Sequence, residues 1–253
     1  MPDLDVLVLC GGRGTRLGAF TATTPKPLLP VGGRPFLERL LRALEQEGFR
    51  RFCLAAHYRH EQLTAFCVAH RARWPDLRVI VEPEPLGTGG ALRHAVARLT
   101  APTVMVVNGD SWVSQPLAPV VNAHLAQERV FTAVAVRASR VQGPARDKGV
   151  WTVGPDGRFL GFATQAQAET GWVNAGVYVV DRATVLEWPS GCYSLEASFP
   201  QLLAHRRAGV FCSEGSLFDI GTPEGYAWAD QMLCNTESVM PHEERSTTHD
   251  GHG

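Results

Sequence analysis

The sequence predicts an α/β protein with a Rossmann-like, mostly parallel mixed sheet and helices on both faces. Three observations support this class. Short apolar runs typical of buried strands alternate with longer amphipathic segments through the first half of the chain. With 253 residues, of which 45% are hydrophobic, the chain is long enough to bury one substantial core. A Gly-rich turn follows the first apolar run, at the strand end where open α/β sheets bind ligands.

The elements of the first half follow each other in a regular order. The first strand is expected at Leu4 to Cys10, and a helix from Pro35 to Glu47 carries leucines on one face and stops at Gly48. The further elements of this half are a strand at 52–56, a helix at 59–72, a strand at 77–81, a helix at 88–99 and a strand at 103–107. This order predicts parallel strands connected by crossover helices.

The second half is less regular. Its expected elements are a strand at 131–136, a polar loop at 138–148, a β-hairpin of strands at 149–153 and 158–162, a strand at 172–180, and helices at 198–207 and 223–233. Thr222 as N-cap and Pro223 at the first helical position mark the start of the last helix. Residues 1–234 are expected to form a single domain, and residues 235–253, which lack periodicity, a disordered tail.

Composition and charge exclude several classes of protein. A formal net charge of −1 gives no cationic footprint for nucleic acid. No apolar run approaches the length of a membrane span, and Asp3 and Asp5 stand where a secretory signal carries basic residues. Six cysteines without a Cys-x-x-Cys pair favour reduced residues of the core. We therefore expect a soluble, cytoplasmic protein without nucleic-acid or membrane partners; its oligomeric state, a homo-oligomer included, stays open.

The Gly-rich turn has the composition of a polyphosphate-binding loop, although an ordinary turn after a strand is the alternative. Glycines let the backbone approach an anion closely, and cationic side chains lie among them. The residues of this turn are Cys10, Gly11, Gly12, Arg13, Gly14, Thr15 and Arg16. The spacing excludes a P-loop, because no Lys follows a Gly anywhere in the chain. Leu17 stands where a dinucleotide-binding motif requires its third Gly.

Three further residues have the chemistry of a phosphate and metal site. Lys26 is one of only two lysines and lies between two prolines, which fix the backbone around it. Asp110 follows the strand at 103–107, and Asp219 lies between hydrophobic residues, where an unpaired charge is costly. Both acids suit Mg²⁺. The alternatives are a simple turn for Asp110 and a helix cap or ion-pair partner for Asp219.

The longer pattern resembles the signature of the sugar-1-phosphate nucleotidyltransferases, which have a GT-A-like fold. Gly-Gly-x-Gly-Thr-Arg-Leu at 11–17 is followed by Pro-Lys-Pro-Leu-Leu-Pro at 25–30. Further matching segments lie at 84–91, 108–110, 174–176, 194–196 and 219–223, so the resemblance covers most of residues 4–232. Within the family it is closest to the branch typified by D-glycero-α-D-manno-heptose 1-phosphate guanylyltransferase.

This resemblance implies a role for each matched residue. Arg16 would hold the β- and γ-phosphates of a nucleoside triphosphate, and Lys26 its α-phosphate and the attacking sugar phosphate. Asp110 and Asp219 would ligate Mg²⁺. The nucleotide site would also include the Gly-rich turn and the residues Glu82, Glu84, Gly87 and Thr88 of the loop at 82–90. Asn174 and Glu196 would lie near the sugar, and the small hairpin would border it; a strand-edge residue and a solvated acid are the alternative interpretations of these two side chains.

One departure from the family concerns the sugar phosphate. Relatives carry a Phe-x-Glu-Lys segment after the hairpin, whereas here Phe162 is followed by Ala163 to Glu169 without a lysine. Lys148, the only other lysine, could supply that contact, although a solvated loop residue is the alternative.

The resemblance implies that a sugar 1-phosphate attacks a nucleoside triphosphate to give a nucleotide sugar and pyrophosphate. Guanine presents two adjacent donors that a carboxylate such as Glu82 or Glu84 accepts together, which favours GTP, and the branch favours a heptose. The alternatives are mannose 1-phosphate guanylyl transfer and uridylyl, thymidylyl or adenylyl transfer to another hexose 1-phosphate. A glycosyltransferase typically has an Asp-x-Asp pair, and Asn108 and Trp112 stand two residues either side of Asp110. A non-catalytic regulatory relative would have lost Lys26 or an acid, and all are present.

Overall fold

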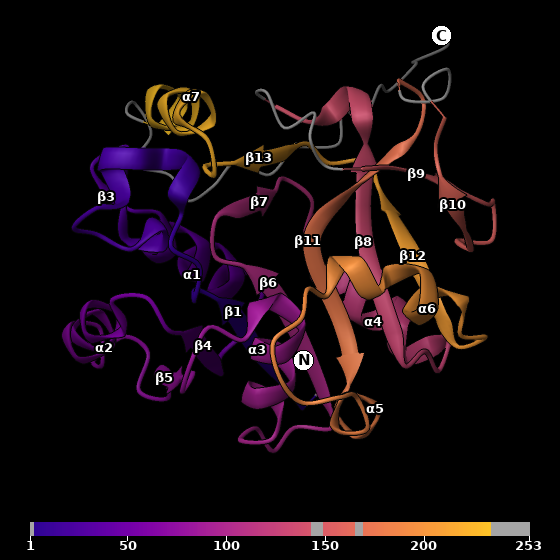
Figure 1. Cartoon of the computed structure of the whole chain (residues 1–253), viewed down its shortest axis with the longest axis horizontal. Coiled ribbons are helices and arrows are strands. Elements are labelled where there is room, and N and C mark those ends of the chain that lie inside the picture. Colours follow the sequence, from indigo (N-terminus) through magenta and orange to yellow (C-terminus); the bar gives the residue numbers. More distant parts are fainter. Residues whose placement is uncertain (1–2, 143–148, 165–168, 234–253) are drawn as a thin grey trace, which may run out of the picture.

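The structure, a computed structural model, describes residues 3–142, 149–164 and 169–233. A nine-stranded mixed sheet forms the centre of the molecule, with seven strands in the order β10-β9-β11-β6-β1-β4-β5 and with β8 and β12 beyond β11 (Figure 1). Its strands are β1 (Leu4–Leu9), β4 (Phe52–Ala56), β5 (Arg78–Val81), β6 (Thr103–Asn108), β8 (Phe131–Arg137), β9 (Val150–Val153), β10 (Phe159–Phe162), β11 (Trp172–Asp181) and β12 (Ala208–Ser213).

The first half of the sheet is parallel, as its alternation with helices predicts. β1 pairs with β4 and β6, and β4 pairs with β5, all in parallel register. β11 then reverses the direction, because it runs antiparallel to β6 on one edge and to β8 on the other. β12 lies parallel to β8, and the hairpin of β9 and β10 extends the sheet from the first residues of β11.

Helices cover both faces of the sheet, which confirms the predicted fold class. Alternate residues of β1 enter opposite cores: Val6 and Val8 pack with α1, α2 and α4, whereas Leu7 packs with α3, α5 and α6. The helices are α1 (Phe36–Gln46), α2 (His60–Ala69), α3 (Gly87–Val96), α4 (Ala118–Ala126), α5 (Arg182–Leu186), α6 (Phe199–Ala204) and α7 (Pro223–Leu233). None of the helices in the described ranges has the length and apolar character needed to cross a bilayer.

Several elements had no counterpart in the sequence prediction. β2 (Pro30–Val31), β3 (Arg34–Pro35), β7 (Ser111–Val113) and β13 (Leu217–Asp219) are too short to show a two-residue period. α4 has no amphipathic pattern, and α6 ends at Ala204, three residues before its predicted end, because the chain becomes extended at His205 to enter β12. The predicted disordered tail at 235–253 lies outside the described residues.

The cysteines of the described part are all free thiols. Cys10, Cys53 and Cys67 are buried, as predicted, and burial raises the pKa of Cys53 to about 11. The prediction that all cysteines belong to the core is wrong for Cys192, which is exposed in the loop before α6. A thiol with a raised pKa stays protonated at neutral pH, so the buried cysteines act as small apolar residues.

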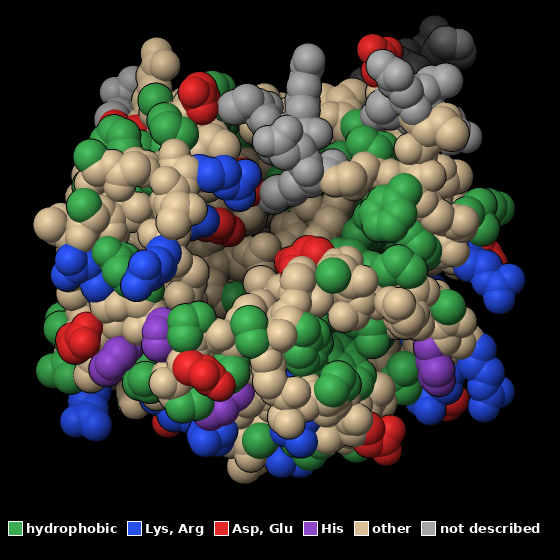
Figure 2. Space-filling model, in the orientation of Figure 1, with side chains coloured by type: hydrophobic (Ala, Val, Ile, Leu, Met, Phe, Trp, Pro, Cys, Tyr) green, Lys and Arg blue, Asp and Glu red, His purple; other side chains and the backbone are tan. Residues whose placement is uncertain are grey.

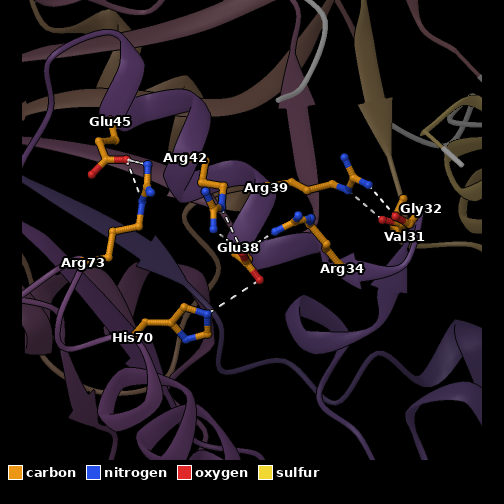
Figure 3. Close-up of polar contacts among 9 residues, drawn as sticks. All are labelled: Val31, Gly32, Arg34, Glu38, Arg39, Arg42, Glu45, His70 and Arg73. Atoms are coloured by element: carbon orange, nitrogen blue, oxygen red, sulfur yellow. Dashed lines mark hydrogen bonds and ion pairs between the residues drawn. The ribbon is translucent and has the colours of Figure 1, made fainter. Parts of the chain in front are cut away.

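Glu38 anchors α1 to the neighbouring elements through a network of cations. Its carboxylate lies 3.2 Å from Arg34 Nη1, 2.8 Å from Arg42 Nη2 and 3.6 Å from His70 Nε2 (Figure 3). Burial of the carboxyl raises its pKa, but the hydrogen bond and the charge of Arg42, with His70 and Arg34, outweigh burial and lower the pKa below its usual value. The folded state therefore favours the ionised carboxylate.

Replacement of this carboxylate by an amide tests the network. We expect Glu38→Gln to cost about 1 to 2 kcal/mol of unfolding free energy at pH 7. Because the folded pKa is depressed, this stabilisation is complete above the usual carboxyl pKa of about 4.3 and is lost as the pH falls through the lower folded value. Thermal unfolding from pH 7 to pH 3 measures it. Glu61→Gln, at an exposed site near His60, is the control; equal effects of the two changes would contradict the assignment.

Candidate active site

A short two-stranded ladder brings two distant acidic residues together. β7 pairs antiparallel with β13, so that Ser111 lies opposite Asp219. The Ser111 hydroxyl lies 3.1 Å from Asp110 Oδ1 and 3.4 Å from Asp219 Oδ2. The backbone N–H of Ile220 donates to the carbonyl oxygen of Asp110 at 2.9 Å, which ties the two segments together. Two carboxylates therefore flank one hydroxyl beyond the carboxyl end of β6.

Lys26 joins this cluster from the N-terminal part of the chain. Its Nζ lies 2.5 Å from Asp110 Oδ2, and the two side chains are only 14% and 21% exposed. Lys26 begins a short 3₁₀ helix between Pro25, which is its N-cap, and the buried Pro27. Because each proline fixes its own φ, the backbone that carries the ammonium has little freedom. The cation is held beside the carboxylates before any ligand arrives.

A cavity of about 350 Å³ opens beside this cluster. Its walls come from the ends of β1 and β6, from the Gly-rich turn and from the start of α3. Figure 2 shows a hollow in the middle of this face, with acidic and basic side chains near it. The predicted site residues that line the cavity are Cys10, Gly11, Gly12, Lys26, Glu82, Gly87, Thr88 and Asp110. Its volume is in the range of small-molecule sites.

The other predicted residues do not line this cavity. Gly14 has a left-handed backbone (φ 65°) and starts the 3₁₀ helix at Thr15–Thr21, where Arg16 is exposed. Asp219 contacts the Ser111 hydroxyl in the cluster of Asp110, Ser111 and Asp219, which we call the acidic cluster, but it is not part of the cavity wall. Glu84, Asn174 and Glu196 are outside the cavity wall, and Lys148 lies outside the described residues. Arg13 of the predicted Gly-rich turn also lines the cavity, together with two polar residues, His57 and Asn108, that were not predicted. The remaining wall consists of Leu9, Pro27, Pro85, Ala91 and Gly109.

Glu82 is a buried carboxylate at the cavity wall. Its Oε2 accepts from the backbone N–H of Leu86 at 3.2 Å, whereas Oε1 is buried without a hydrogen-bond partner. A Cβ at Gly11 would lie only 2.3 Å from Oε1, so a larger residue there would require the Glu82 carboxylate to move. Burial raises the pKa of Glu82, against the smaller opposing effects of the Leu86 N–H and of His57. An unsatisfied acceptor in this place is available to a ligand donor.

The start of α3 is tied to the loop that carries Glu196. The Thr88 hydroxyl donates to Glu196 Oε2 at 2.6 Å and accepts from the backbone N–H of Leu195 at 2.8 Å. Backbone bonds from Gly89 N to Tyr193 O and from Tyr193 N to Leu86 O, both 3.0 Å, hold the same two segments. Thr88, predicted as a nucleotide residue, therefore also fixes the carboxylate that was predicted for the sugar.

Asn174 lies at an irregularity in β11. The register between β11 and β8 shifts between Asn174 and Tyr178, which is the signature of a β-bulge. The Asn174 amide donates to the Tyr178 hydroxyl at 2.7 Å, and its oxygen accepts from the Gly176 N–H at 3.1 Å. Burial raises the pKa of Tyr178, with a smaller contribution from the charge of Glu196. The Asn174 side chain is thus held in place by the backbone N–H of Gly176 and by the buried hydroxyl of Tyr178.

The cluster of Asp110, Asp219 and Ser111 offers the hard oxygen atoms that Mg²⁺ prefers. Across the described ranges, no group of three or more Asp, Glu, His or Cys side chains forms a metal-binding set. A pair of carboxylates with few other ligands suits an ion that keeps positions for phosphate oxygens and water. These residues therefore fit Mg²⁺ shared between protein and substrate.

A family model described as nucleotidyl transferase matches residues 5–236. The chain belongs to the nucleotidyl transferase family. The match includes every residue of the cavity wall and of the acidic cluster. The family match therefore spans all the segments that meet at this sheet edge.

Similar members of this nucleotidyltransferase family act on sugar phosphates. The chain is 30% identical to mannose-1-phosphate guanylyltransferase of Mycobacterium tuberculosis, over 98% of this chain and 71% of that protein. It is 28% identical to D-glycero-alpha-D-manno-heptose 1-phosphate guanylyltransferase of Aneurinibacillus thermoaerophilus, over 91% and 98%. The crystal structure of HddC from Yersinia pseudotuberculosis complexed with GMP-PN superposes with a TM-score of 0.77 at 27% identity, covering 90% of this chain and 99% of HddC.

The bond between Thr88 and Glu196 predicts a selective kinetic effect. Thr88→Val removes a donor and an acceptor at nearly constant volume, so Glu196 and Leu195 lose their anchor. We expect the KM for the sugar 1-phosphate to rise about tenfold, with a smaller change for the nucleotide. Thr88→Ser, which keeps the hydroxyl, is the matched control. Equal increases for both substrates in Thr88→Val, or failure of Thr88→Ser to preserve the wild-type values, would contradict this positioning role.

Proposed function

We propose that the protein transfers the guanylyl group of GTP to D-glycero-α-D-manno-heptose 1-phosphate, giving GDP-heptose and pyrophosphate. The observation that carries the proposal is the meeting of Lys26, Asp110 and Asp219 beside a Gly-rich cavity. These groups match the needs of an in-line attack on an α-phosphorus, because negative charge must be neutralised there. Similarity to heptose and mannose 1-phosphate guanylyltransferases supports the same conclusion.

The reaction requires little acid–base chemistry from the protein. The attacking oxygen of a sugar 1-phosphate is already an anion, so positioning and charge neutralisation account for catalysis. Lys26 binds the α-phosphate and the attacking phosphate from its fixed place next to Asp110. Arg16, exposed on the 3₁₀ helix after Gly14, binds the β- and γ-phosphates. Backbone N–H groups of the Gly-rich turn would complete the phosphate contacts.

Asp110 and Asp219 would hold the metal, with Ser111 between them. When bound there, Mg²⁺ would neutralise the negative charge that develops on the phosphates during the transfer. The ion pair with Lys26 offsets part of the negative charge of the two carboxylates.

Glu82 is the residue that we assign to base recognition. Guanine presents N1–H and a 2-amino group side by side, and a carboxylate accepts both hydrogen bonds at once. Glu82 lines the cavity with a buried, unpartnered oxygen, whereas Glu84 is exposed. This difference in burial supports Glu82 over Glu84, which the sequence left as equal candidates. Both named relatives described above are guanylyltransferases, which supports this choice of base.

The sugar is assigned from similarity rather than from a contact. Relatives named for the heptose and for mannose are similarly close, at 28% and 30% identity, so mannose 1-phosphate is the second candidate. Asn174 and Glu196 border the sugar side in our assignment, and both have fixed orientations. Lys148 would reach the sugar phosphate in place of the missing Phe-x-Glu-Lys lysine.

A matrix of substrates tests the proposed function. GTP, ATP, UTP, CTP and dTTP are each combined with the 1-phosphates of D-glycero-α-D-manno-heptose, mannose, glucose and N-acetylglucosamine, and pyrophosphate release is followed with Mg²⁺ present. We expect the highest kcat/KM for GTP with the heptose. A higher value for mannose would move the assignment to the second candidate, and a preference for UTP or dTTP would contradict the guanine assignment.

Removal of either charge at the centre of the cluster tests its catalytic role. We expect Lys26→Met and Asp110→Asn each to lower kcat by about 100-fold or more, since each group acts on charge in the transition state. The double variant is the decisive control, because it removes both members of the ion pair. If the ion pair were only structural, the double variant would be more stable and more active than either single variant. We expect it to be more stable than the single variants in thermal unfolding but no more active.

Base recognition by Glu82 predicts a change of nucleotide preference. Glu82→Gln presents both a donor and an acceptor, as the edge of uracil requires, so the ratio of kcat/KM for GTP over UTP should fall by about tenfold or more. Burial raises the pKa of Glu82, so its carboxylate is protonated at a higher pH than that of an ordinary Glu. As the pH is lowered, the wild-type kcat/KM for GTP should therefore begin to fall earlier than an ordinary Glu would predict, and Glu82→Gln should not show this decrease. Glu84→Gln is the control, and an equal effect there would refute the assignment.

A further inference from the structure

A second cavity lies at the opposite end of the sheet from the active site. It has a volume of about 400 Å³ and is lined by residues that include Arg129, Asp156, Arg158, His205, Arg206 and Arg207. β8 and β12 run in the same direction as β6, because β11 is antiparallel to both β6 and β8 while β12 is parallel to β8. The cavity is lined by residues next to the first residues of β8 and β12, whereas the other cavity is lined by residues that follow the last residues of β1 and β6. Figure 1 shows the course of these strands through the sheet.

The charge of this cavity is strongly unbalanced. Four arginines and one histidine line it with a single acid, Asp156, whose Oδ1 accepts from the backbone N–H of Arg158 at 3.1 Å. Arg207 donates through Nε to the carbonyl oxygen of Glu128 at 2.7 Å. Within the described ranges, none of the four guanidinium groups forms an ion pair with a carboxylate, in contrast to those of Arg34, Arg42, Arg51 and Arg73. Among the described residues, the charge of Asp156 therefore offsets the cations of the cavity only in part.

Arg129 is built into the cavity wall. Its side chain is half-buried, and a Cβ at Gly209 would lie 2.2 Å from Arg129 Nη1, so the guanidinium rests directly on the backbone of β12. A Cβ at Gly157 would lie 3.4 Å from Nη2, on the side of the hairpin turn. Burial lowers the pKa of Arg129, and the charge of Asp156 acts in the opposite direction. A partly desolvated cation in a fixed position is costly unless an anion offsets it.

We propose that this cavity binds the phosphoryl group of a small phosphorylated molecule. Guanidinium groups present several N–H donors in a planar fork that matches the oxygens of a phosphate. A recess that holds only water has no need of several guanidinium groups. Arg129 forms the base of the site, where its guanidinium lies against the backbone of β12, and Arg158 and Arg206 line the site from the hairpin turn and from the segment after α6. The volume is sufficient for a phosphate monoester or a diphosphate of a small metabolite.

Calorimetric titration of the full chain in the background of Lys26→Met, without divalent metal, separates this site from the active site. The probes are inorganic phosphate, pyrophosphate, GMP and mannose 1-phosphate. We expect saturable binding of at least one probe, and the double variant Arg158→Gln/Arg206→Gln should weaken it by about tenfold or more. The matched control Arg71→Gln/Arg98→Gln, which removes two exposed arginines elsewhere, should leave it unchanged.

The probes also identify the source of the phosphate. Equal affinity for inorganic phosphate and the organic probes would assign the site to the free anion, and tighter binding of GMP or of mannose 1-phosphate would assign it to a metabolite of that kind. Absence of binding to any probe up to about 10 mM, or equal weakening by the control variant, would overturn the proposal. Because binding is measured without turnover, the result is independent of the proposed guanylyl transfer.

Discussion

The contact between Lys26 and Asp110 is the interaction on which the site depends. It joins residues 84 positions apart, and it holds a cation beside two carboxylates that would otherwise repel each other. The prolines around Lys26 fix one side of this contact, and the ladder of β7 and β13 fixes the other. The ends of β1 and β6 place both within reach of one cavity. Under the proposed function, preorganised charge at this edge of the sheet would promote transfer between phosphates without a nucleophilic side chain.

The surrounding contacts connect the two halves of the proposed reaction site. Thr88 lies in the first turn of α3 at the cavity wall and also holds Glu196, so the proposed nucleotide and sugar sides share one hydrogen-bonded junction. The bulge of β11 adds a second fixed point at Asn174. A reaction that needs two phosphates in line benefits from this shared frame, because a misplacement of either substrate lowers the rate. The charged cavity beneath β8 and β12 is separate from this frame.

Periodicity in the sequence was sufficient to predict the strands and helices of the parallel half, and the capping residues Thr222 and Pro223 marked the start of α7. It was insufficient for β7 and β13, because three residues show no period and their pairing is set by tertiary contacts. The two acids were therefore recognisable as candidates, but their meeting through Ser111 was not. The same limit applies to Glu82 and Glu84, which have the same chemistry in the sequence and differ only in burial. His57 and Asn108 line the cavity through folding alone, although Asn108 directly precedes the predicted Gly-Asp turn, whereas Arg13 belongs to the Gly-rich turn that the sequence predicted.

The central claim is that the site joins two phosphates by attack of a sugar phosphate on the α-phosphorus of GTP. Phosphorus NMR of a reaction with sugar 1-phosphate labelled with ¹⁸O at its non-bridging phosphate oxygens tests this directly, because the isotope shifts the phosphorus signals. We predict that the label appears in the bridge of the new diphosphate, that pyrophosphate forms in equal amount without label, and that neither forms without Mg²⁺. Label in the pyrophosphate, or release of inorganic phosphate in place of pyrophosphate, would contradict the account.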